Sequence, residues 1–208
     1  MMKVVEGIMS ENVKNKKTVI YILLIAAIII IALAVTTIVM FAAVDKDAVT
    51  EDSSGETSVS KLSIDDSSEY ADSLFACAVT DINDSASVVK LLETMKFEDS
   101  AGEYTAQISA VDGVQVLDLN LSQKISKGDQ KVFNENIGKC AQQMLALIPG
   151  IERVQWTYSI DTADASKEEA KVSIDAEGAT KELGSDVRAF GESASKFQKL
   201  LSKQKNVE

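Results

Sequence analysis

The chain has 208 residues, with 32 acidic side chains, 21 basic side chains, two cysteines and no histidine. Without histidine, the sequence excludes Ser-His and Cys-His nucleophile systems and metal sites of the HExxH type. Residues 45–208 carry a net charge of −13, which argues against nucleic acid and anionic lipid surfaces as partners of this part of the chain.

Residues 18–44 form an uncharged, strongly apolar stretch that follows a short tail of mixed charge, residues 1–17. A helix of this length can cross the ~30 Å hydrocarbon core of a bilayer. Lys14, Lys16 and Lys17 directly precede the stretch, and acidic residues follow it. Because positive flanks stay in the cytoplasm, we expect a single-pass protein of the cell membrane with its N-terminus inside and its C-terminal domain outside.

A cleaved signal peptide is the alternative to a membrane anchor. The apolar run is about twice as long as the usual 7–15-residue core of a signal peptide. An Ala-x-Ala triplet occurs at Ala32-Leu33-Ala34, but it lies inside the run rather than after it. We therefore expect an uncleaved signal anchor.

Residues 45–68 are rich in Asp, Glu, Ser and Thr and contain few apolar side chains. Such a composition cannot bury enough apolar surface to fold, so it predicts a flexible acidic stalk. An extracytoplasmic domain is expected over residues 69–208. Its first apolar cluster, Tyr70 to Val79, fits either a helical turn or a short strand.

The next predicted element is a helix capped by Asp84 and Ser85. Its apolar residues recur at the spacing of a single helix face, at Val88, Leu91, Leu92 and Met95.

Asp112-Gly113 is a strong signal for a two-residue hairpin turn. Pairing around this turn places Ile108 opposite Leu117 on an apolar face. The partner face is polar, with Gln107 opposite Asp118 and Thr105 opposite Asn120. A shift by one residue would destroy this sorting, so turn chemistry and hydrophobic pattern predict the same register.

A longer helix is expected from Asp129 to Ile148, ended by Pro149-Gly150. Two strands follow, with Val154, Trp156, Tyr158 and Ile160 pointing inward on the first and Ala170, Val172, Ile174 and Ala176 on the second. Together with the hairpin they predict an α+β domain in which an antiparallel sheet of about four strands is covered by helices on one face.

The C-terminal segment has helical apolar spacing from Leu183 to Leu201. It fits one long helix or two helices broken near Gly191, and it is too short and too glycine-rich to favour a coiled coil. Cys77 and Cys140 lie in the predicted outer domain, where they form either a disulfide or two buried free thiols. Trp156 fits a core position better than an exposed binding position.

Candidate catalytic and metal-binding patterns are weak. Ser-x-x-Lys occurs from Ser58, Ser87 and Ser193, but the accompanying elements of the penicillin-recognising enzymes are missing, so Ser87 is not assigned as a nucleophile. The acidic clusters do not have the spacing of a calcium loop; they are Asp81/Asp84, Glu98/Asp99/Glu103 and Glu168/Glu169. We therefore assign no catalytic, cofactor-binding or metal-ligating residue and expect no cofactor.

Several segments together resemble the small extracytoplasmic family of domain of unknown function 4825 from Gram-positive bacteria. They are Asp84-Ser85 before Val88-Val89 and Leu91-Leu92, Met144 to Ile148, Val154-Gln155-Trp156, Leu183 to Arg188, and Phe197 to Leu201. The family's usual helix opening resembles Gly-Asp-Asn-Ser, from which Asn83-Asp84-Ser85 departs. The lead-in Asn12 to Lys17, with the apolar stretch, resembles the last membrane helix of beta-lactam-sensor-type membrane metallopeptidases. The peptidase part is absent, and the resemblance implies no catalytic or binding residue.

These observations favour a non-enzymatic, membrane-anchored protein whose outer domain binds an unknown ligand or partner in the manner of a sensor. One alternative is an accessory subunit that pairs with another membrane protein through residues 18–44, in which Thr36 and Thr37 are weak hydrogen-bonding candidates. A second is a cell-envelope hydrolase, which requires two carboxyl groups facing each other across a cleft.

Overall fold

The computed structural model describes residues 59–162 and 168–206. The predicted tail and anchor, residues 1–44, and most of the predicted stalk lie outside these ranges. None of the helices in the described ranges has the length and apolar character needed to cross a membrane.

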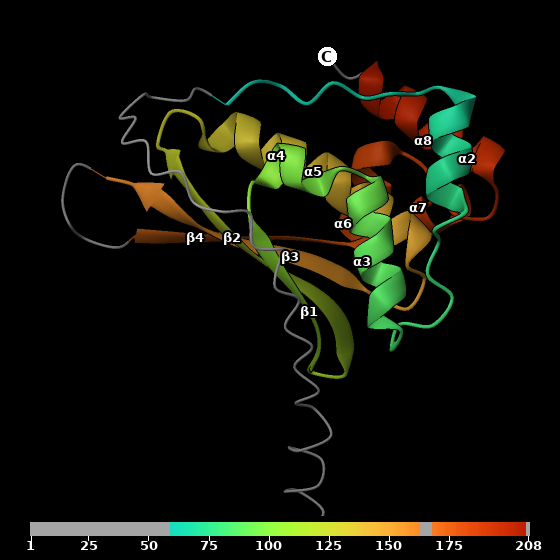
Figure 1. Cartoon of the computed structure of the whole chain (residues 1–208), viewed down its shortest axis with the longest axis horizontal. Coiled ribbons are helices and arrows are strands. Elements are labelled where there is room, and N and C mark those ends of the chain that lie inside the picture. The colour runs from blue at the N-terminus through green and yellow to red at the C-terminus, as the bar shows by residue number, and fades with distance from the viewer. Residues whose placement is uncertain (1–58, 163–167, 207–208) are drawn as a thin grey trace, which may run out of the picture. The chain divides into compact units, whose positions relative to one another are not determined.

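The described part is an α+β unit with one four-stranded sheet in the order β1-β2-β3-β4 (Figure 1). The strands are β1 (Tyr104–Val111), β2 (Val114–Ser126), β3 (Arg153–Asp161) and β4 (Glu168–Asp175). The helices are α2 (Ser68–Phe75), α3 (Ser85–Thr94), α4 (Phe97–Ala101), α5 (Gln130–Leu147), α6 (Ala176–Leu183), α7 (Val187–Phe190) and α8 (Ala194–Lys205).

The β1–β2 hairpin has the predicted register, with Ile108 opposite Leu117 and Gln107 opposite Asp118. Asp112 and Gly113 both have positive φ, 54° and 80°, as a type I′ turn requires. The turn therefore twists with the strands, and the apolar face of the hairpin meets the core.

The prediction of an antiparallel sheet is wrong at its centre, because β2 and β3 run parallel. Val154 at the start of β3 pairs with Leu117 near the start of β2. Helix α5 carries the chain back along the sheet between them, which is the connection that parallel neighbours need. The sheet is consequently mixed, since β1–β2 and β3–β4 are antiparallel.

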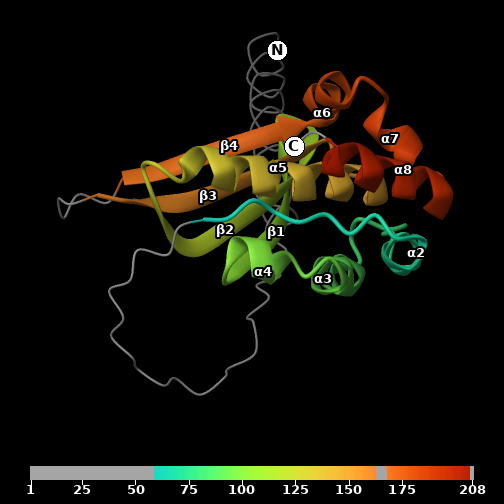
Figure 2. The ribbon, with the colours of Figure 1, turned by 90° about the horizontal axis from the view of Figure 1, so that it is seen from above.

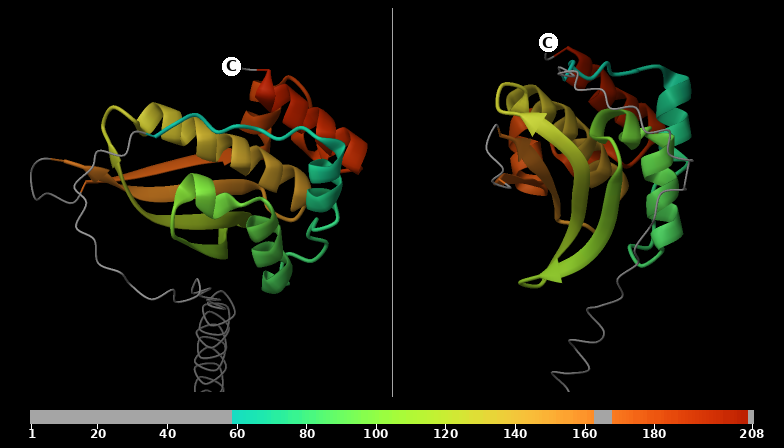
Figure 3. Two further views of the ribbon diagram at one scale, coloured as in Figure 1. Left: turned by 45° about the horizontal axis from the view of Figure 1, so that its top comes forward. Right: turned by 60° about the vertical axis from the view of Figure 1, so that its left-hand side comes forward.

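Helix α5 is the centre of the core and lies along one face of the sheet (Figure 2). Its buried apolar residues include Phe133, Ile137, Met144 and Leu145, which belong to one cluster with Leu117, Leu119, Val154 and Trp156 of the strands. The remaining helices gather on the same side of the curved sheet (Figure 3). This confirms helical cover on one face.

The C-terminal segment is broken into α6, α7 and α8. Gly184 ends α6 with a positive φ of 62°, a conformation that favours glycine. Gly191 ends α7 for a different reason: a Cβ built there would lie 1.8 Å from the backbone oxygen of Ala146 in α5. Close packing against α5 therefore decides where this segment bends.

Residues 59–66, here called the strap, differ from the expected flexible stalk. Asn136 of α5 accepts a hydrogen bond from the Leu62 N–H (2.8 Å) and donates one to the Ser60 carbonyl oxygen (2.8 Å). Asp66 accepts from the Ser202 hydroxyl (3.0 Å) and pairs with Lys205 (2.6 Å) on α8. The strap is thus part of the folded unit, which begins before Glu69.

Both cysteines are free thiols. Cys140 is buried on α5, where burial raises the pKa of its thiol to about 12, and Cys77 is half-buried with its sulfur 3.5 Å from the Thr94 hydroxyl. The sequence allowed either a disulfide or two free thiols, and the structure contains the free thiols.

Candidate functional site

The sheet face that points away from the helices is lined mostly with polar side chains, with Val116 as a buried apolar member (1% exposed); we call it the open face. Alternation along each strand produces it, because most of the intervening residues belong to the core or pack against it. Cross-strand registers place its members in three rows: Gln107, Asp118, Gln155 and Ser173; Thr105, Asn120, Thr157 and Lys171; and Ser109, Val116, Arg153 and Asp175.

A hydrogen-bond network at the centre of the open face links three strands. The Ser109 hydroxyl donates to Asp118 Oδ2 (2.7 Å), and the Gln155 amide donates to Asp118 Oδ1. All three side chains are half-buried, whereas Thr105 and Asn120 at the margin are exposed. The network holds the Asp118 carboxylate in a defined orientation, so the centre of this face is ordered and polar.

A groove of about 490 Å³ lies between the strap and α4. Lys61 and Ser63 of the strap line one side, and Glu98 and Asp99 of α4 line the other. Asn136 of α5 also lines the groove. The two carboxylates are adjacent on one helix and do not face each other across the groove. This arrangement differs from the paired carboxylates that the hydrolase alternative requires.

The Ser-x-x-Lys serines have structural partners where the structure describes them. Ser87 donates its hydroxyl hydrogen to Asp84 Oδ2 (2.6 Å), and Asp84 caps α3 as predicted. Ser193 caps α8 by accepting from the Lys196 N–H (3.2 Å). Ser58 lies outside the described ranges.

The acidic clusters stay separate. Within residues 59–162 and 168–206 there is no group of three Asp, Glu, Cys or His side chains that could hold a metal ion. Trp156 is a core residue, 2% exposed, and its indole N–H donates to Asn134 Oδ1 (2.9 Å). Asn134 also donates to the Tyr158 hydroxyl (2.9 Å), so one helix side chain satisfies both aromatic residues of β3.

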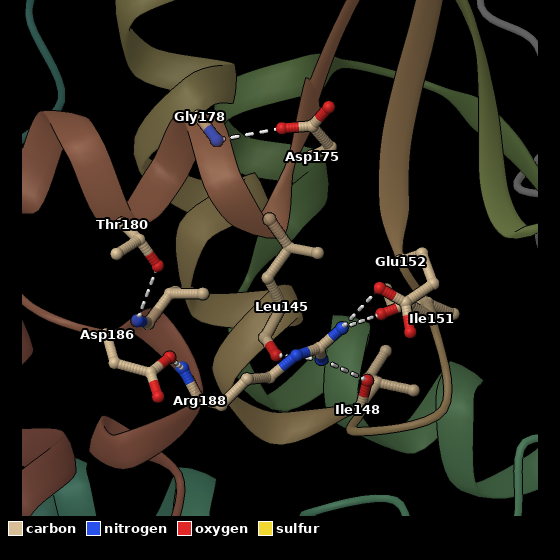
Figure 4. Close-up of polar contacts among 10 residues, drawn as sticks. Leu145, Ile148, Ile151, Glu152, Asp175, Gly178, Thr180, Asp186 and Arg188 are labelled. Carbon is tan, nitrogen blue, oxygen red and sulfur yellow. Dashed lines mark hydrogen bonds and ion pairs between the residues drawn. The ribbon is translucent and has the colours of Figure 1, made fainter.

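Arg188 of α7 is the most highly connected cation in the described part of the chain, and its role is structural. Its guanidinium donates to the carbonyl oxygens of Leu145 (2.5 Å), Ile148 (3.0 Å) and Ile151 (Figure 4). Glu152 lies 4.0 Å away. Arg188 therefore binds carbonyl groups at the C-terminal end of α5 and in the loop that follows it, where the Ile148 oxygen also accepts from the Ile151 N–H (3.1 Å).

The sequence predicted the position of Asp118, the central member of the network, because the hairpin pattern placed it on the polar face. It contained no signal that Gln155 would lie beside Asp118. That contact depends on the parallel pairing of β2 and β3, which joins segments 37 residues apart.

No family model matches the chain, and neither curated proteins nor solved structures include a significant match. The resemblance to the family of domain of unknown function 4825 therefore stays a prediction.

Proposed function

We propose that the chain is a non-catalytic, single-pass membrane protein of the bacterial cell envelope, and that its outer domain is a binding module for a partner protein. The anchor is inferred from residues 18–44 and their charged flanks. The observation that carries the binding role is the open face, whose centre is ordered by the Ser109–Asp118–Gln155 network while its margin is exposed.

Site-specific photo-crosslinking in intact cells tests the binding role. A photoreactive amino acid is placed at Asn120 or Ser173 of the open face, and in a control variant at the exposed Lys199 on α8. We expect one specific adduct from the open-face positions and a much weaker one from Lys199. Equal adducts from all three positions, or none above background, would contradict the proposal.

A topology measurement tests the anchor independently. Reporter fusions after Glu208 are compared, one active only outside the cytoplasm and one active only inside it. We expect activity from the first alone. Activity from the second alone would contradict the proposed orientation, whatever the crosslinking shows.

A further inference from the structure

The two edges of the sheet differ in charge. β4 carries Glu168, Glu169, Lys171 and Asp175, whereas β1, from Tyr104 to Val111, has no charged residue. Charged side chains on an edge strand discourage pairing with another chain. By this criterion β4 is a protected edge and β1 is not.

The backbone of β1 presents free hydrogen-bonding groups on its outer side. In a two-residue hairpin the residues flanking the turn, Val111 and Val114, form a hydrogen-bonded pair, and such pairs then recur at every second residue. The bond from the Ser122 N–H to the Glu103 carbonyl oxygen (2.8 Å) fits this alternation. The N–H and C=O groups of Tyr104, Ala106, Ile108 and Ala110 consequently point away from β2.

These outward groups have no hydrogen-bond partner elsewhere in residues 59–162 and 168–206. Ala106 is only 5% exposed, whereas Ile108 is half-buried and Ala110 is exposed, so the accessible outward groups lie toward the turn. Donors and acceptors that alternate at strand spacing match the backbone of an extended peptide. The neighbouring side chains are small or apolar toward the helices, as at Ala106, Ile108 and Ala110. Those toward the open face are polar, as at Gln107.

The charge around β1 distinguishes between two possible occupants. Glu103 and Asp112 flank the strand, and Glu93 and Glu98 act electrostatically on Tyr104. None of these four carboxylates is in an ion pair with another described residue. A second copy of the chain in antiparallel pairing would bring two such sets of carboxylates together, and they would repel each other. A strand with basic ends would instead be attracted by the carboxylates.

We propose that the outer edge of β1 binds an extended segment of a partner protein, uncharged and alternating at its centre and basic at its ends, which adds a strand to the sheet beside β1. This inference rests on the proposed function and names the surface and the kind of partner. Main-chain hydrogen bonds supply the affinity, Ile108 and Ala110 select apolar side chains, and the flanking carboxylates select basic ones.

A peptide-display selection on the full chain in detergent micelles tests the inference. One library has alternating apolar and polar residues between Lys-Lys ends, and a matched library has Glu-Glu ends. We expect enrichment from the Lys-Lys library alone. Failure of both libraries, or enrichment from the Glu-Glu library, would overturn the proposal.

Residue-resolved amide exchange locates the binding of an enriched peptide. The amides of Ile108 and Ala110 should exchange rapidly in the free protein and slowly in the complex, while Gln107 and Ser109 stay protected in both. Protection confined to the groove or to other strands would overturn the proposal. Protection of the β1 amides without peptide, together with a dimeric mass, would assign the edge to a second copy instead.

The Ala110→Pro variant removes one outward donor without touching the pairing with β2. We expect about tenfold weaker peptide binding with an unchanged melting temperature. Gln107→Ala is the matched control, because it changes the open face and leaves the backbone edge intact; equal losses in both variants would contradict an edge site.

The crosslinking experiment in cells distinguishes a failure of the β1 edge site from a failure of the proposed binding role. An adduct from Asn120 whose yield is unchanged in the Ala110→Pro variant refutes the β1 edge and leaves the binding role in place. If the chain without the Ala110→Pro substitution gives no adduct at any position, both the β1 edge site and the binding role are refuted.

Discussion

At the residue scale, a few buried or half-buried polar side chains determine how the helices pack against one another. Gln204 of α8 donates to Gln142 Oε1 (2.8 Å) and to the Lys139 carbonyl oxygen (2.9 Å), and it accepts from Gln143 (2.8 Å). Every buried side-chain N or O atom in the described part of the chain has a hydrogen-bond partner. Such satisfied networks specify one packing, because any other register would leave polar atoms unpaired.

Arg188 is the single side chain whose removal should matter most at this scale. Arg188→Met keeps much of the aliphatic volume but removes three hydrogen bonds to carbonyl groups of residues 145–151, of which the Ile148 oxygen keeps another donor, the Ile151 N–H. We expect a loss of about 3 kcal/mol in the free energy of unfolding. Urea denaturation measures it, and Lys199→Met at an exposed position should change it by less than about 0.5 kcal/mol. Equal effects of the two variants would refute the capping role.

At the element scale, close contact between α7 and α5 decides the shape of the C-terminal segment. Gly191 has an ordinary φ of −80°, so space and not backbone conformation requires glycine there. The strap shows the same dependence on neighbours, since its own composition predicts no structure and Asn136 and Asp66 fasten it to α5 and α8.

Gly191→Ala should destabilise the domain by at least about 2 kcal/mol, because the new methyl group would overlap the Ala146 carbonyl oxygen. Gly138→Ala is the matched control: it lies within α5 and a Cβ there meets no atom within 4 Å. That variant should gain up to about 1 kcal/mol from helix propensity. Thermal unfolding of both variants measures these changes in stability. If Gly191→Ala left the stability unchanged, the contact between Gly191 and the Ala146 carbonyl oxygen would not be tight.

Asn136→Ala should release the strap while leaving the fold in place. The variant loses both hydrogen bonds to the strap, and trypsin cleavage after Lys61 should become faster in the native protein. Asn83→Ala, in an exposed loop, is the control. Unchanged cleavage in Asn136→Ala would mean that Asp66 alone holds the strap.

At the scale of the whole molecule, the helices of the described residues form one layer on one side of the sheet, and a mostly polar sheet face lies on the other side. The same layer buries three groups that titrate at high pH. Burial raises the pKa of Cys140 to about 12 from 9.0, and those of Tyr70 and Tyr104 to about 12 from 10.0.

Stability should therefore fall at alkaline pH. The folded state holds these protons more tightly than the unfolded state, so the stabilisation is complete below pH 9 and is lost as the pH rises from 9 toward 12. A fully buried group contributes at most about 1.4 kcal/mol per pH unit, and the half-exposed tyrosines contribute less.

Melting temperatures between pH 7 and 11 measure this loss. Cys140→Ala should remove the part that begins near pH 9, and Cys77→Ala controls for loss of a thiol as such. A profile that is the same in Cys140→Ala and the unchanged chain would contradict the assignment to Cys140.

The amino-acid sequence by itself determined the features that depend on neighbours a few residues away. The Asp112-Gly113 turn and the alternation on both sides of it define the β1–β2 register, and the apolar stripe from Phe133 to Ile148 defines α5. Turn conformation and side-chain periodicity are local properties, which explains why these predictions are confirmed.

Only the tertiary structure decided the direction of β3, the bend at Gly191, the docking of the strap and the contact of Gln155 with Asp118. Each depends on where a distant segment lies after α5 has packed on the sheet. The open face and the uncharged edge of β1 have the same origin, because the described helices gather on one side of the sheet.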